Sequence, residues 1–168
     1  DTNQYRKGYL LKDDGLAFDN NLDTSSLYGV ITYGFRLTEH LSTIENTVES
    51  IRQKLGSPVS PHAVSRHEQD GYFRADDTLA GNPWIICSLW IAQYYVRRGQ
   101  ITVAEETLDW LDQMATKNSM LPEQIHPHSG TQISVTPLVW SHAEYINTSL
   151  DVAQLSSDRP KQGEPASP

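Results

Sequence analysis

Residues 120–146, MLPEQIHPHSGTQISVTPLVWSHAEYI, place a glutamate and a glutamine directly after a proline. Glu123 stands in this polar loop between apolar neighbours, ahead of a segment that carries Trp140. A carboxylate held in such a position can take a proton from water while the amide of Gln124 orients that water. Seen alone, the loop fits a solvated glutamate better, so the chemistry depends on what lies beside it.

A second polar loop, SRHEQDGYFRADDTLAGNPW at residues 65–84, carries groups suited to hydroxyl-bearing ligands. Arg66 and Asp70 can direct forked donors and acceptors at hydroxyl groups. Tyr72 and Trp84 offer flat faces that suit sugar rings. The plainer interpretation is a polar loop with a surface ion pair and a core tryptophan, and composition alone favours it.

Three histidines invite a metal interpretation, but their spacing argues against it. His126 and His128 lie two residues apart in an extended loop, and neither they nor His142 form a pair with a strong metal-ligand spacing. We expect no metal and no other cofactor. The one cysteine, Cys87, lies on an all-apolar helical segment and is expected to be inert core.

Length and charge limit the class of protein. The 168 residues fit one domain of ordinary size or part of a larger one. The net charge of −8 argues against nucleic acid or an anionic membrane as a partner, and no apolar run approaches the roughly 18 residues of a membrane span. A single cysteine excludes an internal disulfide, and we see no signal peptide, so we expect a cytoplasmic protein.

The segments that must position the two loops have helical patterns, with almost no strand signal. Residues near 43–55 and 102–116 carry an apolar stripe on one face and are predicted to be surface helices. Residues near 24–35, 82–97 and 136–150 are apolar nearly all round, so they are predicted to be buried helices.

Residue types at the ends of these segments predict where the helices begin and end. We expect capping boxes at Ser42 with Glu45 and at Thr102 with Glu105. The expected N-caps of the buried helices are Asp23, Asn82 and Thr136. Gly56 and Gly99 are expected to end the helices that precede them.

The buried helices start near 24, 82 and 136, a period of about 55 residues that is typical of stacked helical hairpins. Residues 56–81 and 117–135 form long connections into buried helices, whereas the short stretch GQIT joins the middle buried helix to its surface partner. All long loops therefore fall on one rim, where sites are commonly built.

An inner and an outer ring of antiparallel helices describe an all-α fold, the α/α toroid. With about three inner and two outer helices, the chain holds roughly half of a six-hairpin barrel. We assign residues 1–152 to this C-terminal half and expect residues 153–168, which are polar and Pro-rich, to be a disordered tail.

The two loops together resemble glycoside hydrolase family 15, the glucoamylase family. GNPWIICSLWIAQYY looks like the family's Gly-Asn-Pro-Trp helix, and RHEQDGY is similar to its Arg-Tyr-x-x-Asp-x-Tyr segment. LPEQIHPHSGTQISVTPLVWSHAEYI resembles its Glu-Gln segment followed by Leu-Thr-Trp-Ser. The resemblance covers roughly residues 22–150 and implies a hydrolase that releases glucose from the ends of oligosaccharides or polysaccharides, with inversion at the anomeric carbon.

By this resemblance, Glu123 matches the catalytic general base that activates water. Arg66 and Asp70 match the segment that binds the sugar hydroxyls at the cleaved end. Trp84 and Trp140 match aromatic residues near the substrate. The expected partner is thus an α-glucan or oligosaccharide.

The sequence departs from the family pattern at three places. His67 stands where the family more often has tyrosine, and residues 137–139 read Pro-Leu-Val instead of Asp-Leu-Thr. The family's general acid lies upstream of the matched segment, and residues 1–20 contain no matching aromatic-Glu motif. We therefore expect the N-terminal half of the same protein to supply the acid, and this chain alone to be inactive.

Two other classes remain open. The chain is alternatively a non-catalytic toroid segment that binds glycans or regulates another activity, or a helical-repeat interaction protein. Glu123 with Gln124, Arg66 and Asp70 distinguishes these hypotheses. A regulatory segment would be free to lose these residues, and an interaction repeat would have no reason to gather them on one rim.

Overall fold

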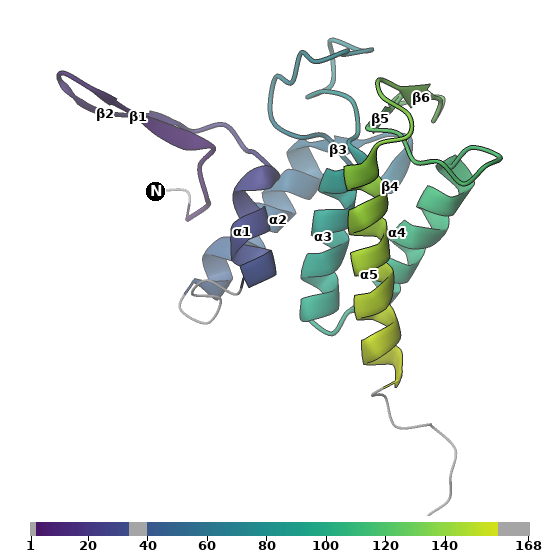
Figure 1. Ribbon diagram of the computed structural model, residues 1–168. Helices are drawn as coiled ribbons and strands as arrows, with labels where there is room; N and C mark the ends of the chain where they lie inside the picture. The colour runs from purple at the N-terminus through teal and green to yellow at the C-terminus, as the bar shows by residue number, and fades with distance from the viewer. Residues whose placement is uncertain (1–2, 34–39, 158–168) are drawn as a thin grey trace, which may run out of the picture.

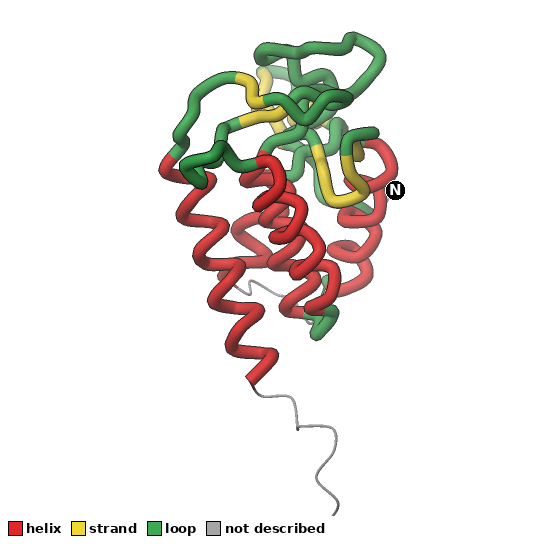
Figure 2. The backbone as a smooth tube through the Cα atoms, turned by 90° about the vertical axis from the view of Figure 1, so that its right-hand side faces the viewer, coloured by secondary structure: helices red, strands yellow, loops and turns green. Residues whose placement is uncertain are grey.

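The computed structural model describes residues 3–33 and 40–157, and within these ranges the chain is mainly helical. The helices are α1 (Ser25–Tyr33), α2 (Leu41–Lys54), α3 (Ile85–Arg97), α4 (Ile101–Met114) and α5 (Val139–Ser157). They lie side by side with the longer loops collected at one end, as the two views in Figures 1 and 2 show. The long connections therefore do share one rim, at the starts of α3 and α5.

Short β-hairpins precede or join the helices, although almost no strand signal is visible in the sequence. In the described residues, β1 (Gly8–Lys12) pairs with β2 (Gly15–Asp19), β3 (Gly56–Ser57) with β4 (Ser60–Val64), and β5 (Gln124–Ile125) with β6 (Gln132–Ile133), all antiparallel. Strands β3, β5 and β6 have two residues each, and the five-residue strands β1, β2 and β4 do not alternate clearly between apolar and polar residues, which explains why the sequence did not indicate them. The β1–β2 hairpin projects away from the helices (Figure 1).

Helix α3 forms the centre of the structure, as its all-apolar sequence predicted. Every residue of α3 except Tyr95 and Arg97 is buried, and the helix contacts α1, α4 and α5. Cys87 on this helix is fully buried, and burial raises the pKa of its thiol well above the usual value. The helix ends at Arg97, and the chain turns away at Gly99, whose φ of +73° favours glycine and whose N–H donates to the Val96 carbonyl.

The two surface helices bury the predicted stripes. Ile44, Val48 and Ile51 of α2 pack into a core shared with α1 and α3. Leu111 of α4 packs with Ile85 and Leu89 of α3 in a second core. Their polar faces remain exposed, as amphipathic helices require. The prediction of two surface helices is therefore confirmed.

Helices α1 and α5 are less buried than we expected. On α5, large apolar side chains are exposed, namely Val139, Trp140, Ile146 and Leu150. On α1, Leu27 and Ile31 are buried, but Tyr33 is 78% exposed. Helix α1 packs against α2 and α3, and α5 packs against α3 and α4, but no further helix of the described chain covers their outward faces. The end helices of a partial ring lack the neighbours that would cover their second face.

Several expected helix ends are wrong. Helices α2 and α4 begin at Leu41 and Ile101, and neither receives a capping hydrogen bond from a side chain. The capping boxes Ser42–Glu45 and Thr102–Glu105 therefore lie inside the helices. At α4, buried Ile101 extends the helix by one residue, because its side chain packs into the core.

Helices α3 and α5 begin later than we expected, after Trp84 and at Val139. Asn82 and Thr136 are therefore not N-caps, and Asn82 turns its side chain toward the loops instead. Helix α5 also continues to Ser157, past the expected start of the tail at residue 153. The rest of that tail, residues 158–168, lies outside the described residues.

Polar side chains hold the inner helices together. Glu144 of α5 is buried, with its carboxylate accepting hydrogen bonds from Tyr28 of α1 and Gln93 of α3. Burial, followed by the Glu144 charge, raises the pKa of Tyr28.

No helix in the described part of the chain has both the length and the apolar character that a bilayer span requires.

Candidate active site

Arg66, Asp70 and Trp84 form one cluster at the rim. The Arg66 guanidinium donates to Asp70 Oδ1 at 2.7 Å, and the Trp84 indole N–H donates to Asp70 Oδ2 at 2.9 Å. The guanidinium also lies over the Trp84 ring, 4.3 Å from its centroid. Asp70 is 1% exposed, and such a buried carboxylate needs partners of this kind. Trp84 therefore contacts both members of the Arg66–Asp70 pair, Asp70 through its indole N–H and Arg66 through the face of its ring.

Tyr72 borders this cluster on the solvent side. Its backbone N–H donates to Asp70 Oδ1 at 3.2 Å, and its ring lies 5.9 Å from that of Trp84. Tyr72 is 45% exposed, so part of the residue is accessible to a ligand. A half-exposed aromatic ring beside a charged pair is the arrangement that we expected for a sugar site.

The segment that carries Glu123 is joined to the start of α3 by backbone hydrogen bonds. The Ile85 N–H donates to the Glu123 carbonyl at 3.1 Å, and the Ile125 N–H donates to the Pro83 carbonyl at 3.1 Å. Trp84 and Gln124 thus face each other in an antiparallel bridge. Two loops that lie about 40 residues apart in sequence are therefore neighbours.

Ser134 holds the carboxylate of Glu123. The Ser134 hydroxyl donates to Glu123 Oε2. The backbone N–H of Glu123 donates to the carbonyl of Val135, the residue after Ser134, at 2.9 Å. The Glu123 side chain is half-buried, with the second oxygen free of side-chain partners among the described residues. Sequence reasoning missed Ser134, because a serine inside TQISV carries no signal until the hairpin is formed.

Gln124 lies beneath the surface. It is fully buried, and its Oε1 accepts a hydrogen bond from Asn82 Nδ2 at 2.8 Å. Asn82 Nδ2 also donates to the Phe73 carbonyl, and its Oδ1 accepts from the Ala75 N–H. The observed role of the Gln124 amide is thus to link the two loops, and its predicted contact with substrate stays a prediction.

Trp140 lies on the same rim without touching the Arg66 cluster. Its ring is 50% exposed and packs edge-on against Trp90 of α3, 5.8 Å between centroids. The next residue, Ser141, donates to the Pro122 carbonyl at 2.8 Å, which fixes the start of α5 beside the Glu123 segment. The structure therefore brings Arg66, Asp70, Tyr72 and Trp84 into contact, with the Glu123 segment beside them and Trp140 against Trp90 instead.

Two buried donors of the site have no hydrogen-bond partner among residues 3–33 and 40–157. They are Arg66 Nε and Gln124 Nε2, one from each loop. A buried N–H without an acceptor is costly, so such groups commonly bind water or a ligand oxygen. Hydroxyl oxygens of a sugar or ordered water fit this requirement.

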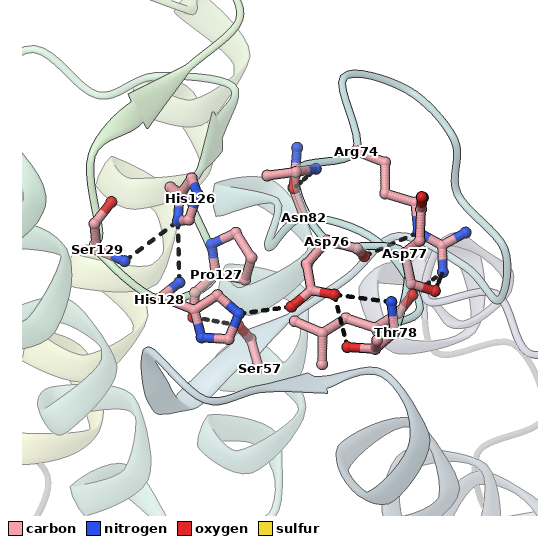
Figure 3. Close-up of polar contacts among 12 residues, drawn as sticks. Ser57, Arg74, Asp76, Asp77, Thr78, Asn82, His126, Pro127, His128 and Ser129 are labelled. Atoms are coloured by element: carbon pink, nitrogen blue, oxygen red, sulfur yellow. Dashed lines mark hydrogen bonds and ion pairs between the residues drawn. The ribbon is translucent and has the colours of Figure 1, made fainter.

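A hydrogen bond between side chains at the edge of the rim ties the same two loops together. His128 Nε2 and Asp76 Oδ2 lie 2.7 Å apart, and Figure 3 shows this contact bridging the loops. Hydrogen bonds from the Thr78 hydroxyl, and then from His128, hold the pKa of Asp76 well below its usual value.

The part of the chain that the structure describes contains no group of three or more His, Cys, Asp or Glu residues able to hold a metal.

Comparisons with known proteins agree with the resemblance seen in the sequence. The family described as Glycosyl hydrolases family 15 matches residues 4–150. An uncharacterized glycosyl hydrolase of Methanocaldococcus jannaschii is 27% identical over 146 residues, which cover 76% of this chain and 21% of that protein. A trehalase of Mycolicibacterium smegmatis is 26% identical over 147 residues, with 86% and 21% covered.

A solved structure of a bacterial glucoamylase complexed with acarbose has a similar fold. Its TM-score is 0.70 at 19% sequence identity, and the match covers 91% of this chain and 25% of that one. The likeness confirms the all-α toroid, of which this chain forms a part. The chain spans about a fifth of the length of the curated relatives that it matches.

Proposed function

Since the chain belongs to the glycosyl hydrolases family 15, we propose that it is the part of a larger enzyme that hydrolyses terminal α-glucosidic bonds with inversion. One observation carries the proposal. Backbone hydrogen bonds between the Glu123 segment and the start of α3 set a half-buried carboxylate beside the Arg66–Asp70–Trp84 cluster. A proton acceptor next to a hydroxyl-binding cluster is what sugar hydrolysis requires.

Glu123 is the general base in this proposal. A water molecule on the far side of the sugar ring gives its proton to the free carboxylate oxygen of Glu123 as its own oxygen attacks the anomeric carbon. The bond from that carbon to the leaving oxygen breaks, and a general acid protonates the leaving oxygen. Ser134 donates a hydrogen bond to the other Glu123 oxygen and so fixes the orientation of the carboxylate toward the water.

The acid belongs to the N-terminal half of the protein in this proposal. Inversion requires the two carboxyl groups to stand about 6.5–9.5 Å apart, with the water between them. Arg66 and Asp70 hold hydroxyl groups of the terminal glucose, and Tyr72 and Trp140 border that ring. Because relatives of this chain include trehalases, trehalose stands beside maltose and isomaltose as a candidate substrate.

Replacing Glu123 by glutamine in the longer protein tests the proposal. Glutamine keeps the shape and the hydrogen bond from Ser134 but cannot take a proton. We expect kcat to fall about 10²–10⁴-fold while KM changes only a few-fold, because a general base acts in the transition state. The matched control is Glu105→Gln on the exposed face of α4, which should leave both constants unaltered.

The products identify the mechanism. Wild-type enzyme should release β-glucose first, as NMR of fresh reaction mixtures would show. Near-normal turnover of Glu123→Gln would refute the assignment of the base. A longer protein that binds glucans but hydrolyses none would support the non-catalytic glycan-binding alternative instead.

A further inference from the structure

Phe73 stands out in the loop between β4 and α3. Its ring is 61% exposed, and its backbone is left-handed with φ +51°. This conformation is unfavourable for residues with a Cβ and uncommon for bulky ones. Such strain persists where the surroundings fix it, and it concentrates at functional sites.

A buried amide holds Phe73 in place. Asn82 is 1% exposed, and its Nδ2 donates to the Phe73 carbonyl at 2.8 Å. Its Oδ1 accepts from the Ala75 N–H at 3.0 Å, so the chain is fixed on both sides of Arg74. The same Nδ2 reaches Gln124, the neighbour of Glu123. The position of Phe73 is thus set relative to the proposed base.

Phe73 is the outer end of a row of aromatic rings. The row starts at Trp84, which is 5% exposed and lies under the Arg66 guanidinium. Tyr72 follows at 5.9 Å, and Phe73 lies 4.8 Å beyond it, edge to face. Exposure rises along the row from the charged end to solvent. A pyranose ring is about as wide as one step of the row, so a sugar bound at Arg66 and Asp70 would leave Phe73 free.

We propose that Phe73 contacts the second sugar ring, on the leaving-group side of the bond that is cleaved, and thereby sets the preference among disaccharides. The inference rests on the proposed function of Glu123, Arg66 and Asp70. The apolar C–H face of a pyranose packs against an aromatic ring, without a hydrogen bond to any particular hydroxyl. Such a contact selects the orientation of the second ring, and hence the linkage.

The test uses the longer protein and compares its activity on a substrate with one sugar ring and on a substrate with two. α-Glucosyl fluoride has one ring, and the second substrate is whichever of maltose, isomaltose and trehalose the wild type cleaves best. For each variant we take the ratio of kcat/KM for the disaccharide to kcat/KM for the fluoride. We expect Phe73→Ala to lower this ratio roughly tenfold, and Phe73→Tyr to keep it within about twofold.

The control is Phe18→Ala, which removes a similarly exposed phenylalanine from the hairpin that projects away from the helices (Figure 1) and should not change the ratio. An unchanged ratio for Phe73→Ala would overturn the inference and leave the proposed function standing. So would a lower melting temperature without a change in ratio, since Phe73 would then be a packing residue. If the wild type shows no hydrolysis that depends on Glu123, the proposed function fails, and this inference fails with it.

Discussion

Asn82 joins the two loops of the candidate site through one buried side chain. Its amide bonds to Phe73, Ala75 and Gln124, which together position the aromatic row and the Glu123 segment. The sequence led us to expect an N-cap here, because asparagine before proline is common at helix starts. The same donor and acceptor groups serve loop contacts instead, since α3 begins three residues later.

Replacing Asn82 by alanine should destabilise the protein. The change leaves the Phe73 carbonyl, the Ala75 N–H and the Gln124 Oε1 without this partner, and unsatisfied buried groups cost about 1–3 kcal/mol each. We expect the free energy of unfolding to fall by about 2–4 kcal/mol in urea titrations, because water reaches some of these groups. Asn118→Ala, at an exposed position, should change it by less than about 0.5 kcal/mol. Equal values for the two variants would show that the Asn82 contacts contribute little.

Sequence patterns found the charged and aromatic parts of the site but not the residues that hold them. Arg66, Asp70 and Trp84 carry recognisable chemistry at close spacing, so their cluster could be predicted. Ser134 and Phe73 could not, since their roles depend on left-handed backbone conformations that no residue type indicates.

At the scale of elements, periodicity predicted the helices well and their ends poorly. Stripes of apolar residues on α2 and α4 and the all-apolar α3 were read correctly, because burial determines these patterns. The hairpins escaped prediction, since β3, β5 and β6 have only two residues each and the five-residue strands do not alternate clearly between apolar and polar residues. The ends shifted because packing of residues such as Ile101 outweighs the small free energy of a cap.

The contact between β4 and α4 should make stability depend on pH. Burial lowers the pKa of His62 below 6.5, and Arg52 lowers it further, while Glu106 of α4 acts in the opposite direction. Well above pH 6.5 the imidazole is neutral in both the folded and the unfolded state. As the pH falls below 6.5, the unfolded chain binds this proton more readily than the folded chain, so stability decreases.

Thermal unfolding between pH 7.5 and 5.5 would measure this effect. The wild type should lose more stability over this range than His62→Gln, which has no group to protonate at this position. His40→Gln, at the exposed start of α2, controls for the removal of a histidine. Parallel curves for the wild type and His62→Gln would show that burial of His62 does not influence folding.

At the scale of the whole molecule, the exposed faces of α1 and α5 describe an incomplete ring. A monomer seldom exposes large apolar side chains in number along one helix, as α5 does with Val139, Trp140, Ile146 and Leu150. The all-apolar sequences of these helices fit burial on two sides, but the described chain covers one. The sequence thus predicted burial on both sides of α1 and α5, which this chain alone does not provide.

Ile146→Ala tests whether the longer protein covers α5. Ile146 is 56% exposed here, so in the 168-residue chain the substitution should change stability by less than about 0.5 kcal/mol. In the longer protein, burial of the same side chain should make the change cost about 2–5 kcal/mol. Denaturant titrations of both proteins provide the comparison. A neutral effect in both would contradict the half-toroid interpretation.

The burial of Cys87 allows thiol modification to report on the opening of α3. The chain has one cysteine, so every reaction with a thiol reagent occurs at this helix. The thiol is enclosed and its pKa is raised, so a reagent reacts only after α3 has separated from its neighbours. The rate of modification therefore measures how often the centre of the toroid opens, without any engineered label.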